Sequence, residues 1–166
     1  FTVPYPVDYG GVFDLFYKLP ALQQQGVKIH LHCFDYGRGQ QAELNKHCVS
    51  VNYYPRKPFQ LFSSTPFIVA SRQNEELFQN LLKDDHPVLM EGIHCTALLN
   101  DDRFSGRKCF VRLHNIESDY YNDLAEAASS PLKKMYYRRE SHLLKRYEKT
   151  MAPEAVFLSV TGKYAI

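Results

Sequence analysis

Apolar and polar residues alternate along short stretches of the chain, and longer amphipathic stretches separate them. Between residues 27 and 33 every second residue is apolar, which is the period-two pattern of a strand. Further short apolar runs predict strands at residues 49–54, 87–90, 108–113 and 155–160. Helix patterns occupy residues 11–25, 40–46, 74–83, 118–128 and 131–151. Strands that alternate with helices predict an α/β fold with a doubly wound, mainly parallel sheet and helices on both faces.

The size and the ends of the sequence predict one domain taken from a longer protein. At 166 residues, 45% hydrophobic and 23% charged, the chain fits one globular domain with a core. Phe1-Thr2-Val3 resembles the end of a strand, and Lys163-Tyr164-Ala165-Ile166 follows the last strand almost at once. We therefore expect residues 1–166 to be a single domain whose continuation is missing.

The cysteines and the hydropathy exclude several classes of protein. Four cysteines lie far apart and form no Cys-x-x-Cys pair, so neither a zinc knuckle nor a thioredoxin-like motif is expected. Isolated cysteines of this kind are typical of a reducing, cytoplasmic compartment. The sequence contains no signal-peptide pattern and no run of 18 apolar residues.

An apolar strand at residues 109–113 runs directly into His114-Asn115-Ile116-Glu117 and then into a helix. Ligands of α/β sheets bind beyond the carboxyl ends of the strands. This placement makes His114 the first candidate for chemistry, with Asn115 and Glu117 beside it. The alternative is that His114 and Asn115 only cap the helix that follows.

A second predicted strand also ends in ionisable residues, because Glu91-Gly92-Ile93-His94 follows residues 87–90. Two strand ends that carry histidine and glutamate favour a shared cleft. At the start of the chain, Asp8-Tyr9-Gly10-Gly11 joins the first strand to the first helix. Glycines at a helix N-terminus allow a phosphate to approach the backbone N–H groups, although the pair could also form only a tight turn.

The segment Gly-Arg-Gly-Gln-Gln-Ala at 37–42 matches the dinucleotide-binding fingerprint by letter. No acidic residue lies between Glu43 and Glu75, so the carboxylate that binds the ribose in an NAD site is missing. Arg56 could bind the 2′-phosphate of NADP instead. An NADP-dependent or non-catalytic nucleotide-binding domain is therefore the alternative function.

The predicted helix at 131–151 is strongly basic. Seven lysines and arginines against two glutamates give it a net charge of +5, and a rough apolar stripe runs through Leu132, Met135, Tyr136, Leu143, Tyr147 and Met151. One packed and one solvated face would explain this pattern. A basic face with tyrosines also suits an anionic membrane surface, and no nucleic-acid reading motif accompanies the charge.

The order of these motifs resembles the N-terminal half of a two-domain, GT-B-fold glycosyltransferase of the glycogen-synthase and mannosyltransferase type. The resemblance rests on Pro-x-Pro-x-Asp-x-Gly-Gly at 4–11, Gly-Val-Lys-Ile-His at 26–30, Glu-Gly-Ile-His at 91–94, Arg-Leu-His-Asn-Ile-Glu-x-x-Tyr-Tyr at 112–121, Leu-x-x-Tyr-Glu at 144–148 and Phe-Leu-Ser-Val at 157–160. It covers nearly the whole chain.

This resemblance implies a Rossmann-like acceptor-side domain, with the nucleotide-sugar donor held mainly by a C-terminal domain absent from the chain. By position, Gly10 and Gly11 would approach the donor phosphates and His114 would act at the transferred sugar. The acceptor side of the cleft would include Asp8, Glu91, His94, Asn115 and Glu117. No Asp-x-Asp motif occurs, so the resemblance implies neither a metal nor a cofactor. It implies cell-envelope polysaccharide synthesis on a glycan or lipid-linked acceptor, in the cytoplasm or on the inner face of the membrane, without nucleic acid.

Overall fold

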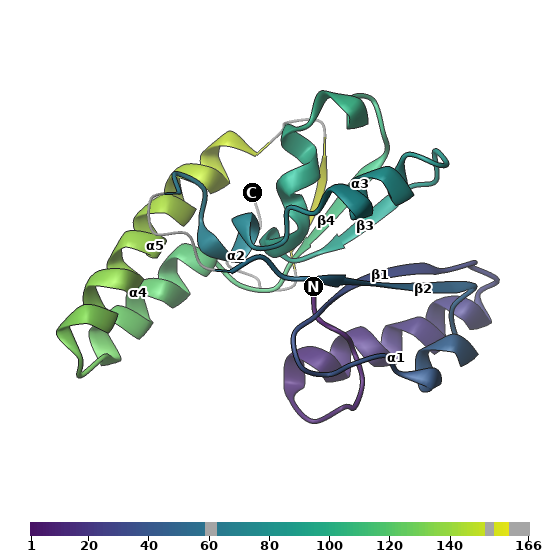
Figure 1. The fold of residues 1–166 in the computed structure, drawn as a ribbon, viewed down its shortest axis with the longest axis horizontal. Coiled ribbons are helices and arrows are strands. Elements are labelled where there is room, and N and C mark those ends of the chain that lie inside the picture. Colours follow the sequence, from purple (N-terminus) through teal and green to yellow (C-terminus); the bar gives the residue numbers. More distant parts are fainter. Residues whose placement is uncertain (59–62, 152–154, 160–166) are drawn as a thin grey trace. The chain divides into compact units, whose positions relative to one another are not determined.

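The computed structural model describes residues 1–58, 63–151 and 155–159. The chain forms two compact units, one of residues 1–56 and 74–77 and the other of residues 57–73 and 78 onward. Every strand pair among the described residues is parallel. The α/β class with parallel pairing is therefore confirmed, and it is consistent with a Rossmann-like fold (Figure 1).

The first unit contains α1 (Gly10–Gln24), β1 (His30–Asp35), the 3-10 helix η1 (Ala42–Lys46) and β2 (Ser50–Pro55). β1 pairs in register with β2, and Thr2 forms a parallel bridge with Phe34, where a strand end was predicted. A hydrophobic core joins the N-terminal segment, α1, β1 and η1 through Val3, Phe16, Leu19, Cys33 and Leu44. α1 thereby covers the sheet face that carries Cys33.

The second unit contains a sheet of order β3-β4-β5, formed by β3 (Val88–Glu91), β4 (Cys109–Leu113) and β5 (Val156–Ser159). Between β3 and β4 lie the 3-10 helices η2 (Ile93–Asn100) and η3 (Asp102–Phe104). The short helix α2 (Phe67–Ala70) and α3 (Glu75–Leu81), whose first residues belong to the first unit, precede the sheet. α4 (Glu117–Ala127) and α5 (Pro131–Thr150) follow β4 as a helical hairpin (Figure 1).

Most predicted elements are present, with ends displaced by one to three residues. The strand expected from residue 27 begins at His30, because the chain is still leaving α1: the Val27 N–H donates to the Leu22 carbonyl at 3.1 Å. The helix expected at 40–46 is only the 3-10 helix η1. α2, η2 and η3 were not predicted, since such short segments show little periodicity. Val160 and Lys163 to Ile166 lie outside the described residues.

Candidate functional site

The carboxyl ends of β3 and β4 bring Glu91 and His114 together. In the parallel register Glu91 lies opposite Arg112, and the Gly92 N–H donates to the Arg112 carbonyl at 2.8 Å. The Glu91 Oε2 atom lies 3.0 Å from His114 Nε2 and 3.3 Å from Arg112 Nη1. A carboxylate only accepts hydrogen bonds, so the histidine Nε2 carries the proton and donates it. The result is a half-buried Glu–His pair beside a guanidinium at the edge where ligands of α/β sheets bind.

Gly92 makes this arrangement possible. Its φ of 82° and ψ of 163° lie in a backbone region that is almost restricted to glycine. A Cβ atom on Gly92 would lie 2.8 Å from His94 Nδ1 and 3.7 Å from His114 Cδ2. The rings of His94 and His114 therefore both border the backbone at the end of β3, which places His94 at the same sheet edge as His114.

The turn from β4 into α4 is not capped by the residues that the sequence suggested. The N-cap residue of α4 is Ile116, which has no side-chain capping bond. The Glu148 carboxylate of α5 takes this place, because it accepts hydrogen bonds from the Ser118 N–H at 3.4 Å and from the Ser118 hydroxyl at 3.0 Å. The hypothesis that His114 and Asn115 serve only as a helix cap is therefore not supported.

Glu117 is buried, whereas Asn115 is exposed. Burial raises the pKa of the Glu117 carboxyl above its ordinary value of 4.5, against the opposing effects of a hydrogen bond from Asn115 and of the nearby His114 ring. A carboxyl with a raised pKa holds its proton longer in the folded protein than in the unfolded chain.

This shift predicts a pH dependence of stability. Between the ordinary pKa of 4.5 and the raised pKa of Glu117, the folded state binds more protons than the unfolded state, so the free energy of unfolding falls as the pH rises. We expect Glu117→Gln to weaken this fall, as measured by urea unfolding from pH 4.5 to neutral pH. Glu126→Gln, at an exposed position of the same helix, is the control. Identical slopes in all three proteins would contradict the burial effect.

In the first unit, Gly10 and Gly11 form the first turn of α1. Both are exposed and neither has a positive φ, so they begin the helix and do not form a tight turn. A Cβ atom on Gly10 would meet nothing within 4 Å, whereas one on Gly11 would lie 3.1 Å from the Tyr9 ring. The first N–H groups of a helix have no partner within it, so this turn has donors suited to an anion.

Asp8 is engaged by Arg38. The guanidinium donates to the Asp8 carboxylate and, at 2.7 Å, to the Pro6 carbonyl, and it lies 5.2 Å from the centre of the Tyr9 ring. The hydrogen bond from Arg38 lowers the pKa of the Asp8 carboxyl. Asp8 therefore orders the loop before α1, a role that the sequence did not indicate.

The glycine-rich segment at 37–42 does not have the geometry of a dinucleotide site. Asp35 Oδ1 accepts hydrogen bonds from the N–H groups of Gly37, Arg38 and Gly39 at 3.1, 2.9 and 3.0 Å. These are the donors that a pyrophosphate would require. In addition, a five-residue 3-10 helix replaces the expected α-helix, and the Arg56 guanidinium lies 4.8 Å from the centre of the Tyr36 ring. The geometry disfavours the nucleotide-binding alternative.

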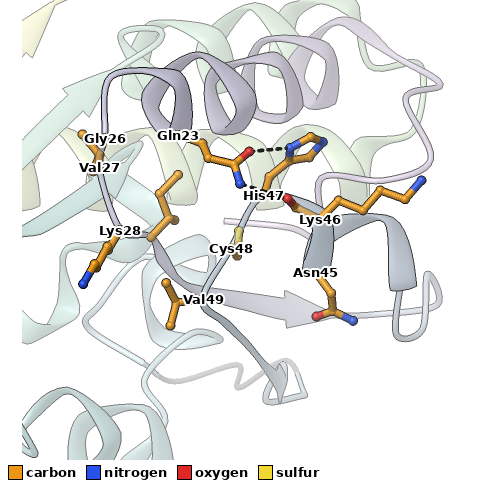
Figure 2. A pocket seen from close by; sticks show the side chains of 10 residues that line it. Gln23, Gly26, Val27, Lys28, Asn45, Lys46, His47, Cys48 and Val49 are labelled. Atoms are coloured by element: carbon orange, nitrogen blue, oxygen red, sulfur yellow. Dashed lines mark hydrogen bonds between the residues drawn. The ribbon is translucent and has the colours of Figure 1, made fainter.

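A shallow cavity of about 290 Å³ lies at the amino ends of β1 and β2, away from the strand ends that bind ligands in such sheets (Figure 2). On its wall Gln23 bonds to the His47 ring at 3.1 Å and to the Lys46 carbonyl at 3.0 Å. Burial raises the pKa of the Cys48 thiol to about 11, so this cysteine stays protonated and unreactive at neutral pH. We assign no chemistry to this cavity.

The structure distributes the expected site residues over both units. The second unit holds Glu91, His94, His114, Asn115 and Glu117, and the first holds Asp8, Gly10 and Gly11. Sequence reasoning missed Arg112 and Glu148, which bond to Glu91 and Ser118. The sequence did contain a signal for Arg112, because a charged residue within an apolar strand is usually paired with an opposite charge.

Comparison with known proteins gives one distant relative. The chain is 26% identical over 143 residues to a Klebsiella pneumoniae protein described as an uncharacterized 44.6 kDa protein in the cps region. The match covers 81% of this chain but only 37% of the relative. No family model and no solved structure matches the chain. Within the described part of the chain, none of the helices combines the length and the hydropathy that a membrane span requires.

Proposed function

We propose that the chain is the acceptor-binding half of a glycosyltransferase, which transfers a sugar from a nucleotide-sugar donor to a glycan or lipid-linked acceptor. The observation that carries this proposal is the pairing of Glu91 with His114 at the carboxyl ends of β3 and β4. The relative encoded in a cps region, the capsule polysaccharide region, supports a polysaccharide-biosynthesis setting. The resemblance of the motif order to glycosyltransferases supplies the reaction class.

His114 has the central role in this proposal. The hydrogen bond that Nε2 donates to Glu91 orients the ring, and in this proposal the ring acts at the transferred sugar. The Glu91 carboxylate stabilises positive charge that develops on the ring. Arg112 lies beside Glu91 and offsets the negative charge of the carboxylate.

The other expected residues bind the substrates. The N–H groups of Gly10 and Gly11 stabilise the charge that develops on the leaving phosphate. In the second unit the acceptor contacts Glu91 and His94, with Asn115 and Glu117 in the same unit, while Asp8 precedes the glycine loop of the first unit. The proposed reaction uses no metal ion and no cofactor. The proposed location is the cytoplasm, at the inner face of the membrane.

Activity of the full-length protein tests the reaction class. With a panel of nucleotide sugars and an extract of cell-envelope glycans and lipid-linked sugars, we expect release of nucleoside diphosphate that depends on both substrates. Release of nucleoside diphosphate at the same rate with and without the acceptor extract would contradict the proposal. So would the absence of turnover with every donor in the panel.

The division of the site between two halves gives a separate prediction. In this proposal only the loop at Gly10 and Gly11 contacts the donor, and the pockets for the base and ribose lie in the C-terminal half. We therefore expect calorimetric titration of residues 1–166 with UDP- and GDP-sugars to show no binding in the micromolar range, whereas the full-length protein binds its donor. Micromolar binding to the 166-residue chain would contradict the split site.

A further inference from the structure

The outward face of α5 is more uniformly positive than the sequence suggests, because both glutamates of the helix are directed inward. Glu140 is fully buried, and its Oε2 atom accepts a hydrogen bond from the Phe67 N–H at 2.6 Å. Glu148 bonds to Ser118 of α4. The exposed charged side chains of α5 are all basic: Lys133, Arg138, Lys145, Arg146 and Lys149.

Two large apolar side chains lie exposed on the same helix. Leu132 is 73% exposed and Met135 is 66% exposed, so their expected membership of a packed apolar stripe is wrong. The buried face runs instead through Glu140 and Leu144. In Figure 1 the α4–α5 hairpin projects away from the strands of its own unit, and Leu132 and Met135 belong to the first turns of α5, at the end of this projection.

Cations that surround exposed apolar side chains suit the interface of a bilayer. The side chains of Leu132 and Met135 can enter the acyl region while Arg138 and, further along the helix, Lys145 and Arg146 meet anionic headgroups. A nucleic acid would use the cations but would leave both apolar side chains in water. The exposed acidic residues of the hairpin, Asp119, Asp123 and Glu126, lie on α4. An anionic partner is therefore favoured on the α5 side of the hairpin.

We propose that the outward face of α5 docks on an anionic lipid bilayer, with Leu132 and Met135 inserted at the tip of the hairpin. The complementarity of charge between this face and acidic headgroups selects the occupant. This inference stands on the exposure and charge of α5 alone and does not depend on glycosyl transfer. It would bring the site of the same unit to a membrane surface, where lipid-linked acceptors are found.

Co-sedimentation with vesicles tests the charges. We expect the protein to sediment with equimolar phosphatidylcholine and phosphatidylglycerol and not with phosphatidylcholine alone. Each basic residue near anionic lipid contributes roughly fivefold to partitioning, so the triple variant Arg138→Gln, Lys145→Gln, Arg146→Gln should bind about 100-fold more weakly. The control Lys28→Gln, Lys57→Gln, Lys108→Gln removes three exposed cations elsewhere and should retain most of the binding. Equal loss in both variants, or no binding by the unmodified protein, would overturn the proposal.

A second variant tests the insertion at the tip. Leu132→Ser with Met135→Ser leaves every charge in place and alters only exposed side chains, so the fold should survive, as circular dichroism would check. We expect at least about a tenfold loss of binding to the anionic vesicles, because the apolar contribution is removed. Unchanged vesicle binding would overturn the insertion. If the protein bound single-stranded DNA more tightly than vesicles, and the double variant bound DNA equally well, the face would be assigned to a polyanion instead.

Discussion

We expect the substitution His114→Ala in the full-length protein to lower turnover by at least about 100-fold, the smaller end of the loss when a positioned acid-base or electrostatic group is removed. The fold should survive, because His114 is only half-buried and follows the end of β4. The packing of β4 depends instead on residues such as the fully buried Val111. Turnover and thermal midpoint should be measured on the same preparation. A fall in turnover with an unchanged thermal midpoint would show a loss of chemistry without a loss of folding.

Two matched variants sharpen this test. Asn115→Ala changes the exposed neighbour in the same turn and should affect turnover much less than His114→Ala. Glu91→Gln retains the size of the side chain but removes the charge that holds the His114 proton, and it should lower turnover in the same direction. A normal rate for His114→Ala would remove this histidine from the active site and leave His94 as the next candidate.

The pairing of Glu91 with His114 could be anticipated because two simple rules apply at this place. Each residue follows a short apolar run, and parallel strands end at the same edge of a sheet. The register then sets Glu91 opposite Arg112, two residues before His114. The α/β class followed from the alternation of strands and helices in the same way, since both depend on local patterns that a single sequence records.

Other features depend on contacts between distant residues and left no local signal. Glu148 caps α4 although it lies 30 residues from Ser118 in the sequence, and no motif around Ser118 predicts this contact. The Gly-x-Gly pattern at 37–39 has the same letters whether its N–H groups face a phosphate or the Asp35 carboxylate, and only the fold decides between them. On α5, the buried face runs through Glu140 and Leu144, and Leu132 and Met135 remain exposed although the sequence places them in an apolar stripe of helical spacing.

Gly92→Ala should damage both the fold and the site. A side chain at φ 82° and ψ 163° is strained by about 1–3 kcal/mol, and we expect the free energy of unfolding to fall by roughly that amount. The new Cβ atom would also lie 2.8 Å from His94 Nδ1, which forces the ring to move, while the contact of 3.7 Å with His114 is tolerable. We therefore expect turnover to fall by roughly tenfold, less than for His114→Ala, because the proposed catalytic ring keeps its place while its neighbour moves.

The control for this prediction is Gly106→Ala. Gly106 also has a positive φ, 76°, in the same unit, but a Cβ atom there would meet nothing within 4 Å. Backbone strain alone should lower the midpoint of urea unfolding in Gly106→Ala and leave turnover close to normal. The displacement of His94 would add the loss of turnover in Gly92→Ala only. If the two alanine variants lost stability and turned over substrate to the same extent, the end of β3 would be an ordinary glycine turn without influence on the histidines. A loss of turnover confined to Gly92→Ala would instead show that the close approach of the backbone to the His94 ring contributes to the geometry of the site.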